Sequence, residues 1–139
     1  MGWASNAIKA LTELIDVSPI DAEAWAELAD LYLTQGAYTQ AIYCLEEVLL
    51  ITPNAWNVSI LVGSVPPQVI DYLLQIHARL GETITITANA SEGAGEQLKL
   101  LSEAMRRFCR SIELCDDYLR GYYGLKLVCF IRRSKSTAC

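Results

Sequence analysis

The sequence predicts an all-α fold, a solenoid of antiparallel helical hairpins, and two observations carry this prediction. On either side of Gly36, apolar residues recur at three- and four-residue spacing, which is typical of two amphipathic helices joined by a turn. Small, apolar and proline positions also recur 34 residues apart, a period at which helical hairpins stack. The recurring pairs are Ala7 and Ala41, Leu11 and Leu45, and Pro19 and Pro53. We therefore expect residues 1–139 to form a single helical domain.

Residues 1–20 are predicted to form a partial repeat, because AIKALTELIDVSP matches the second helix of the hairpin that follows. A first helix for this unit is not part of the sequence. The apolar face formed by Ala7, Leu11 and Leu14 is therefore expected to lack one partner. Solenoids usually contain about three or more repeats with polar caps, so we expect the chain to be part of a longer solenoid.

Residues 21–54 contain the clearest repeat, and its two helices resemble a tetratricopeptide repeat. The signature of that repeat is W-x2-L-G-x2-Y, then A-x3-F, then a proline. The matching residues are Trp25, Leu28, Ala29, Tyr32, Ala41, Leu45 and Pro53. Ala29 replaces the signature glycine, Leu45 replaces the phenylalanine, and Gly36 is expected to make the turn. We expect the small residues to let the helices approach each other, and Pro53 to end the unit.

The repeat pattern is interrupted by residues 58–75, a segment that is not predicted to be helical. The Leu-Gly pair expected at positions 62 and 63 occurs at Leu80-Gly81, eighteen residues late. The segment is either a retained intron or a true surface insertion. Val58-Ser59 can be encoded by GTAAGT and Gln75 by CAG, which are common ends of an intron. We favour the retained intron, because solenoids accept insertions between helices more readily than inside one.

Residues 76–120 are interpreted as a degenerate repeat. The run ETITITANASEGAGE mixes β-branched residues with glycines, so we expect the frayed end of a helix followed by a flexible loop. Its Gly-Ala-Gly lacks the lysine and hydroxyl residue of a phosphate-binding loop. The next helix is predicted to carry A-x3-F at Ala104 and Phe108, and Leu80 and Gly81 are the Leu-Gly pair of this repeat.

Residues 121–139 are predicted to begin a further repeat at Tyr122 and Leu125 and to end in an irregular tail. The tail has basic residues without apolar periodicity, so we expect a solvated or aberrant end rather than a basic binding arm. These basic residues are Arg132, Arg133 and Lys135.

Composition and charge exclude several classes of protein. The 139 residues are 53% hydrophobic and 19% charged, which suits one modest domain with a core and not a disordered chain. The net charge of -5 offers no positive field for nucleic acid or an anionic membrane. No apolar run approaches the ~18 residues of a membrane span, and no leader sequence is recognised. We therefore expect a soluble, cytosolic chain without a nucleic-acid partner.

No group of residues predicts catalysis, a cofactor or a metal site. His77 is the only histidine, and the five cysteines contain no C-x-x-C pair, so we expect ordinary thiols rather than zinc ligands. Glu46 and Glu47 are adjacent on a predicted helix and point about 100° apart, which does not suit a catalytic carboxylate pair. We interpret Asp116-Asp117 as the cap of the next helix.

A small basic edge is the candidate contact with a partner. Arg106 and Arg110 share a face of their predicted helix, and Arg107 is offset from them. Such an edge could contact an acidic partner, lipid headgroups or a neighbouring subunit. The alternative, which we favour, is ordinary pairing of these arginines with Glu103 and Glu113.

Two segments resemble one repeat family more closely than the spacing alone requires. AIYCLEEVLLITP and RRFCRSIELCDDYLRGYYGLKL are similar to subunit 2 of the endoplasmic reticulum membrane protein complex, in its fungal form. The resemblance implies a non-catalytic scaffold on the cytoplasmic face of that membrane, attached through other subunits of the complex. It also implies a role in the insertion of tail-anchored and multipass membrane proteins. The family's solenoid is longer at both ends, so we expect a truncated or mis-spliced version.

The rival class of function is a peptide-binding module of the co-chaperone type, in which lysines and asparagines hold a C-terminal carboxylate. The first helix of the clear repeat offers Glu23, Glu27 and Asp30 and no lysine. Because these charges would repel an acidic peptide, the sequence favours a scaffold that packs against other subunits.

Overall fold

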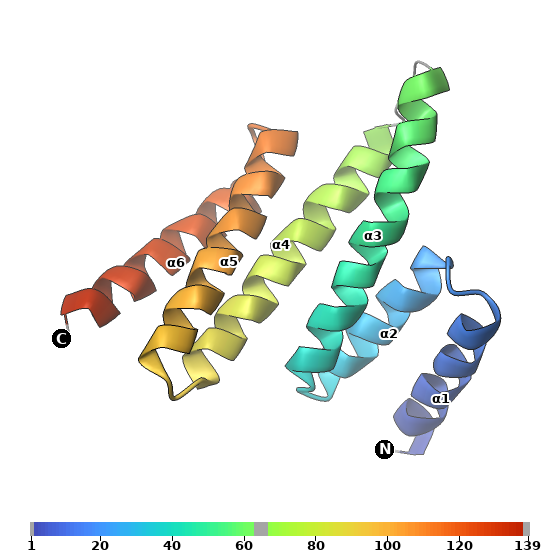
Figure 1. Ribbon diagram of the computed structural model, residues 1–139, viewed down its shortest axis with the longest axis horizontal. Helices are drawn as coiled ribbons and strands as arrows, with labels where there is room; N and C mark the ends of the chain where they lie inside the picture. The colour runs from blue at the N-terminus through green and yellow to red at the C-terminus, as the bar shows by residue number, and fades with distance from the viewer. Residues whose placement is uncertain (1, 63–66, 138–139) are drawn as a thin grey trace. The chain divides into compact units, whose positions relative to one another are not determined.

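The computed structural model describes the backbone of residues 2–62 and 67–137 and the side chains of residues 2–52 and 71–135 (Figure 1). All regular secondary structure in these ranges is helical, which confirms the predicted all-α fold. The helices are α1 (Gly2–Val17), α2 (Ala22–Thr34), α3 (Tyr38–Val62), α4 (Pro67–Ala90), α5 (Ala94–Leu114) and α6 (Leu119–Thr137).

The first compact unit spans Met1–Val65, and in it α1 packs against α2 and α2 against α3. Helix α2 starts after the N-cap Asp21, whose Oδ1 accepts a hydrogen bond from the N–H of Ala24 at 3.2 Å. The core of this unit is made of small and aliphatic side chains that are removed from water. Its most buried members are Ile15, Ala24, Leu28, Ala29, Ala41, Cys44, Leu45 and Val48.

The turn between α2 and α3 is made by Gly36, as the sequence predicts. Gly36 has a φ of +73°, a left-handed conformation that glycine adopts without steric cost. The N–H of Ala37 donates to the carbonyl of Tyr32 at 2.9 Å, and the N–H of Gly36 donates to the carbonyl of Leu33 at 3.2 Å. These two bonds form a Schellman motif, which satisfies the last carbonyls of α2.

Helix α3 does not stop at Pro53, although the sequence pattern predicts that this proline ends the unit. The helix continues to Val62. Proline lacks the N–H that would bond to the carbonyl four residues earlier, but its fixed φ is compatible with helical backbone. Pro53 therefore removes one hydrogen bond from α3 without ending the helix. The side chain of Pro53 lies outside the described residues.

The predicted interruption, residues 58–75, is helical wherever the structure describes its backbone. Residues 58–62 belong to α3 and residues 67–75 to α4, while residues 63–66 lie outside the described residues. The expectation of a non-helical segment is therefore wrong for the described part. Pro67 is the first residue of α4, a position that suits proline because its N–H would have no partner in the helix.

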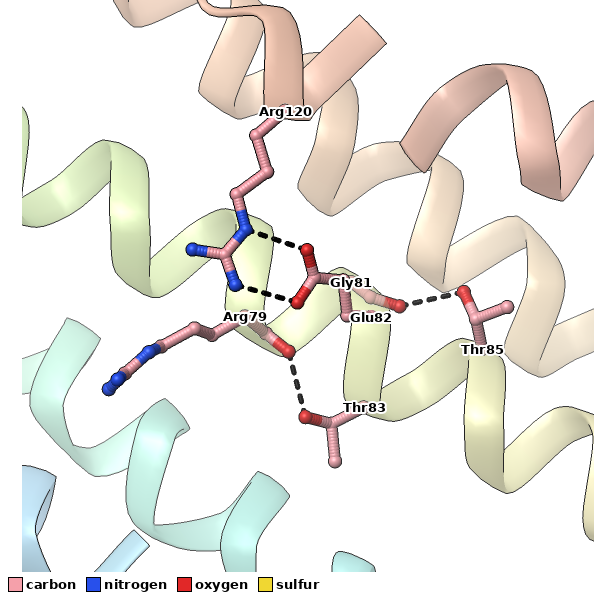
Figure 2. A network of polar contacts seen from close by, with 6 residues as sticks. All are labelled: Arg79, Gly81, Glu82, Thr83, Thr85 and Arg120. Carbon is pink, nitrogen blue, oxygen red and sulfur yellow. Dashed lines mark hydrogen bonds and ion pairs between the residues drawn. The ribbon is translucent and has the colours of Figure 1, made fainter. Parts of the chain in front are cut away.

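Helix α4 continues to Ala90, so the threonine-rich run lies inside the helix and is not its frayed end. Thr83 and Thr85 are buried, and their Oγ1 hydroxyls donate to the carbonyls of Arg79 and Gly81, each at 2.7 Å (Figure 2). These bonds satisfy the buried hydroxyls within the helix itself. Every fourth residue of α4 from Ile76 is also buried, which stabilises the helix against the low helix propensity of threonine. These residues are Ile76, Leu80, Ile84 and Ala88.

The connection between α4 and α5 is shorter than the flexible loop that the glycines suggest. It consists of residues 91–93, and Gly93 is the N-cap of α5. The side-chain amide of Gln97 donates to the carbonyl of Ser91 across this connection. The glycine pair at positions 93 and 95 therefore marks the start of a helix.

Helix α6 extends through the segment that the sequence predicts to be an irregular tail. It ends at Thr137, and Arg132 and Arg133 lie exposed on it. Val128 anchors this half of the helix, since its side chain is fully buried. The tail contains no proline or glycine after Gly124, so nothing in its backbone opposes helical conformation. Cys139 lies outside the described residues.

The second compact unit spans Pro66–Cys139, and α5 packs in it against both α4 and α6. Phe108 of α5 is its largest fully buried side chain. A Cβ atom built on Gly81 of α4 would lie 2.9 Å from the Phe108 ring, and one built on Gly124 of α6 would lie 2.1 Å from it. The aromatic ring therefore fills the space that two glycines on neighbouring helices leave open.

Candidate functional site

The candidate site of this chain is a set of packing surfaces. The residues predicted to form the signature of the clear repeat lie between α2 and α3. Leu28 is 4% exposed, and Ala29, Ala41 and Leu45 are fully buried. Because alanine side chains are small, their burial permits the two helices to approach closely. The signature residues of this hairpin thus form its core, apart from Pro53, whose side chain is not described, and the half-buried Trp25 and Tyr32.

Trp25 connects α2 to the turn before it and to α3. Its Nε1–H donates a hydrogen bond to the carbonyl of Pro19 at 2.9 Å. Its ring lies 5.9 Å from the ring of Tyr43, at an interplanar angle of 70°, which is a favourable edge-to-face arrangement. The tryptophan therefore combines apolar packing with a satisfied polar group.

In the second unit the predicted residues Leu80, Gly81, Ala104 and Phe108 are all buried. Gly81 and Phe108 lie in direct contact, and Gly124 completes the contact from α6. The contact of Gly124 with Phe108 was not predicted from the sequence. A glycine in the interior of a helical pattern, two residues after the predicted tyrosine position Tyr122, is the signal that could have indicated it.

The three candidate arginines lie on α5 and are paired with glutamates of the same helix. Arg106 and Arg107 each lie 3.2 Å from a carboxylate oxygen of Glu103, and Arg110 lies 2.9 Å from one of Glu113. The side chain of Arg106 is 77% exposed. Exposed ion pairs of this kind contribute ~0.5 kcal/mol or less, so their arginines can exchange partners at little cost.

A stronger ion pair joins α4 to α6, and no pattern in the sequence predicted it. The Nε of Arg120 donates to Oε1 of Glu82 at 2.7 Å, and a terminal nitrogen of Arg120 donates to Oε2 at 2.8 Å (Figure 2). This two-pronged geometry matches the planar guanidinium to the carboxylate. The hydrogen bonds to Glu82 raise the pKa of Arg120 above its usual value. The two residues are 38 positions apart, so no short-range pattern could pair them.

His77 is neutral in the folded chain at physiological pH. Burial, followed by the positive charges of Arg107 and Arg110, lowers the pKa of His77 from 6.5 to about 4. Its Nδ1 atom is buried and has no hydrogen-bond partner among the described residues. A charged imidazole at this place would be desolvated and would face two cations, which explains the preference for the neutral form.

The cysteines of the described chain are free thiols. Cys44 is 2% exposed, and burial together with the nearby Glu47 raises its pKa to about 11. Such a thiol stays protonated and is a poor nucleophile. Among residues whose side chains are described, no three His, Cys, Asp or Glu side chains come together in a group that could hold a metal ion.

Two grooves lie on these surfaces. The α1–α2 groove has a volume of about 550 Å³, and apolar Ala7, Ala10, Leu11 and Leu31 line it together with acidic Glu27 and Asp30. The α4–α6 groove has a volume of about 640 Å³, and its lining includes Ile86, Tyr123 and Leu127 beside the Glu82–Arg120 pair. Within residues 2–62 and 67–137, no helix has the length and apolar character required to cross a bilayer.

Comparison with known proteins shows what this chain is similar to. The tetratricopeptide repeat family matches residues 2–59. The TPR repeat protein oca3 of Schizosaccharomyces pombe is 30% identical over 129 residues, which cover 93% of this chain and 37% of that protein. The ER membrane protein complex subunit 2 of Saccharomyces cerevisiae is 31% identical over 123 residues, which cover 88% of this chain and 36% of that protein.

A vertebrate relative matches a shorter part of the chain more closely. The ER membrane protein complex subunit 2-A of Xenopus laevis is 43% identical over 53 residues, which cover 38% of this chain and 18% of that protein. The chain spans little more than a third of the length of the two yeast relatives. The resemblance inferred from the two sequence segments is confirmed by these matches.

Proposed function

Since residues 2–59 match the tetratricopeptide repeat family and the chain is similar to fungal subunit 2 of the ER membrane protein complex, we propose that it is a non-catalytic scaffold that binds other subunits of such a complex. The observation that carries the proposal is the similarity to the Saccharomyces cerevisiae subunit, because it extends over 88% of this chain. A repeat fold alone would support only a general binding role, since one fold serves many functions.

The structure supports a scaffold through the kind of surface that its helices expose. Large apolar side chains lie on the outside of several helices, and they include Val17, Tyr123 and Phe130, which are 84%, 69% and 70% exposed. Exposed apolar side chains that gather in patches are typical of surfaces that pack against other proteins.

The proposed location is the cytoplasmic face of the endoplasmic reticulum membrane, where other subunits would hold the chain. In this position it would help to assemble the machinery that inserts tail-anchored and multipass membrane proteins. The relative's name supports the association with an ER membrane complex. We further propose that Arg106, Arg107 and Arg110 contact an acidic surface of a neighbouring subunit, since the exposed Arg106 and Arg110 are held by weak ion pairs and can change partners.

Affinity purification from fungal cells tests this proposal. The tagged 139-residue chain and a version lacking residues 58–75 are purified in parallel, and the proteins that accompany each are identified by mass spectrometry. Subunits of the ER membrane protein complex are expected with at least the shortened version, whose repeat register is restored. A variant with Arg106, Arg107 and Arg110 changed to Ser should recover less of these subunits.

The comparison requires a matched control. Changing Arg132 and Arg133 to Ser removes exposed charge from α6 and leaves α5 unaltered. It should not reduce recovery if the α5 arginines make the contact. If cytosolic chaperones accompany both versions and complex subunits accompany neither, the scaffold proposal is wrong and a peptide-binding module replaces it.

A further inference from the structure

Two helices of the described chain are left outside a hairpin. Helices α2 and α3 pack as one pair and α4 and α5 as another, whereas α1 packs against α2, and α6 packs against α5 and α4. Helix α6 buries Gly121 and Val128 and exposes an apolar stripe on another face. The stripe follows helical spacing and consists of Leu119, Tyr123, Leu127 and Phe130, which are 66%, 69%, 53% and 70% exposed. We call these four residues the α6 stripe.

The α1–α2 groove has the chemistry that a helix with this stripe requires. It is lined by the small side chains of Ala7 and Ala10, which permit a helix to come close, and by the larger Leu11 and Leu31. Its volume of about 550 Å³ can receive several large apolar side chains. The groove and the α6 stripe are therefore complementary in polarity and in the size of their side chains.

The charges of the two surfaces are also complementary. Glu27 and Asp30 line the groove, and no basic residue belongs to its lining. Helix α6 contains no acidic residue, and Lys126, Arg132 and Arg133 lie exposed along it. Opposite charges that meet at the border of an interface select the partner and its orientation.

The repeat register gives a third reason to pair α6 with α1. Helix α1 carries the residues expected of the second helix of a hairpin, and α6 carries those expected of a first helix. In the observed α2–α3 pair, a first helix packs beside its second helix. An α6 helix placed beside α1 would repeat that arrangement with both helices in their expected roles.

We propose that the chain associates with itself head to tail, with the α6 stripe of one copy seated in the α1–α2 groove of a second copy. The two surfaces are different, so the contact is heterologous and each added copy leaves one groove and one stripe unoccupied. Tyr123 and Phe130 of the stripe are 69% and 70% exposed and together offer roughly 280 Å². This area is small for a stable complex, so the association is of the weak, concentration-dependent class. It does not depend on the function proposed above.

Sedimentation velocity of the purified full chain tests the association. The weight-average mass should rise from one copy toward several as the concentration increases from about one to about 500 micromolar. Phe130→Glu places a negative charge in the stripe, and Ala10→Glu fills the groove and adds to its negative charge. Both residues are exposed, so each variant should keep its circular dichroism spectrum and remain a single copy. Leu50→Glu on α3, an exposed leucine outside both surfaces, should associate like the unaltered chain.

Mixing the two variants separates this arrangement from a contact between two α6 stripes. The Phe130→Glu chain keeps an intact groove and the Ala10→Glu chain keeps an intact stripe, so an equal mixture should form complexes of two copies and no larger ones. The proposal is overturned if the unaltered chain stays single over the whole range. It is equally overturned if Ala10→Glu associates as well as the unaltered chain, or if the mixture remains single copies.

Discussion

Phe108 shows how a few residues determine the packing of a whole unit. Its ring is 1% exposed and contacts α4 at Gly81 and α6 at Gly124. A side chain at either glycine would enter space that the ring already occupies. Interiors are packed almost as densely as organic crystals, so neither helix can give way without loss of other contacts.

Replacing Gly124 by Ala is expected to destabilise the second unit by about 2 kcal/mol. The new Cβ would lie 2.1 Å from the Phe108 ring, which must move, and overpacking of this kind costs ~1–3 kcal/mol. Urea unfolding followed by circular dichroism measures the change. Gly95→Ala is the matched control, because no atom lies within 4 Å of its Cβ and alanine favours helix. Equal destabilisation by both changes would contradict the proposed contact.

Stability is expected to decrease as the pH falls from about 6.5 toward 4, because of His77. Its folded pKa is about 4 and its ordinary value is 6.5, so between these values the unfolded chain binds the proton more readily than the folded chain. The free energy of unfolding should fall by on the order of 2 kcal/mol over this window, a figure that allows for the partial exposure of the imidazole.

The contribution of His77 is isolated by comparison with His77→Gln, whose side chain does not titrate. Unfolding by urea is measured for both chains at several pH values, and the difference between them removes the contribution of the carboxylates. The difference should favour the glutamine variant progressively at lower pH. A constant difference from pH 7 to 4 would show that His77 does not contribute to the acid sensitivity.

Among the helical elements, α4 illustrates how packing overrides local sequence. Threonine is a weak helix former, yet Thr83 and Thr85 lie within α4 and bond to carbonyls one turn back (Figure 2). Their neighbours Ile84 and Ala88 are buried, so the helix is stabilised by its contacts. The Glu82 side chain from the same run holds α6 through Arg120.

The Glu82–Arg120 pair is expected to couple α4 to α6 by ~0.5–1 kcal/mol, since both side chains are partly exposed. A double-mutant cycle with Glu82→Gln and Arg120→Gln measures this coupling through urea unfolding. The Arg106–Glu103 pair, which lies within one helix and has a 77% exposed arginine, serves as the comparison and should couple less. Equal coupling in the two cycles would mean that the geometry between helices adds no stability.

At the level of the whole molecule, residues 58–75 are the segment that interrupts the order of the repeats. We propose that the segment is a retained intron, because its removal brings Leu80-Gly81 into register with Leu28-Ala29. Sequencing of the spliced messenger across this junction should show a dominant form without these codons. A dominant messenger that keeps them would establish a true insertion.

The sequence by itself determined the all-α fold and the α2–α3 hairpin, in which Leu28, Ala29, Ala41 and Leu45 are buried. These features depend on spacings within about 34 residues, where helical periodicity and the Gly36 turn act locally. It also indicated the resemblance to subunit 2 of the ER membrane protein complex, which the comparisons found as well.

The tertiary structure alone decided where α3, α4 and α6 end and which distant residues meet. Local sequence features oppose or do not predict a helix at Pro53, in the threonine run and in the basic tail. All three are helical nonetheless, because neighbouring helices stabilise them or because their backbone geometry is compatible with a helix. The Glu82–Arg120 pair and the seat of Phe108 between Gly81 and Gly124 join residues from different helices. Such contacts form when whole helices pack against each other, so the local sequence pattern around either residue does not predict them.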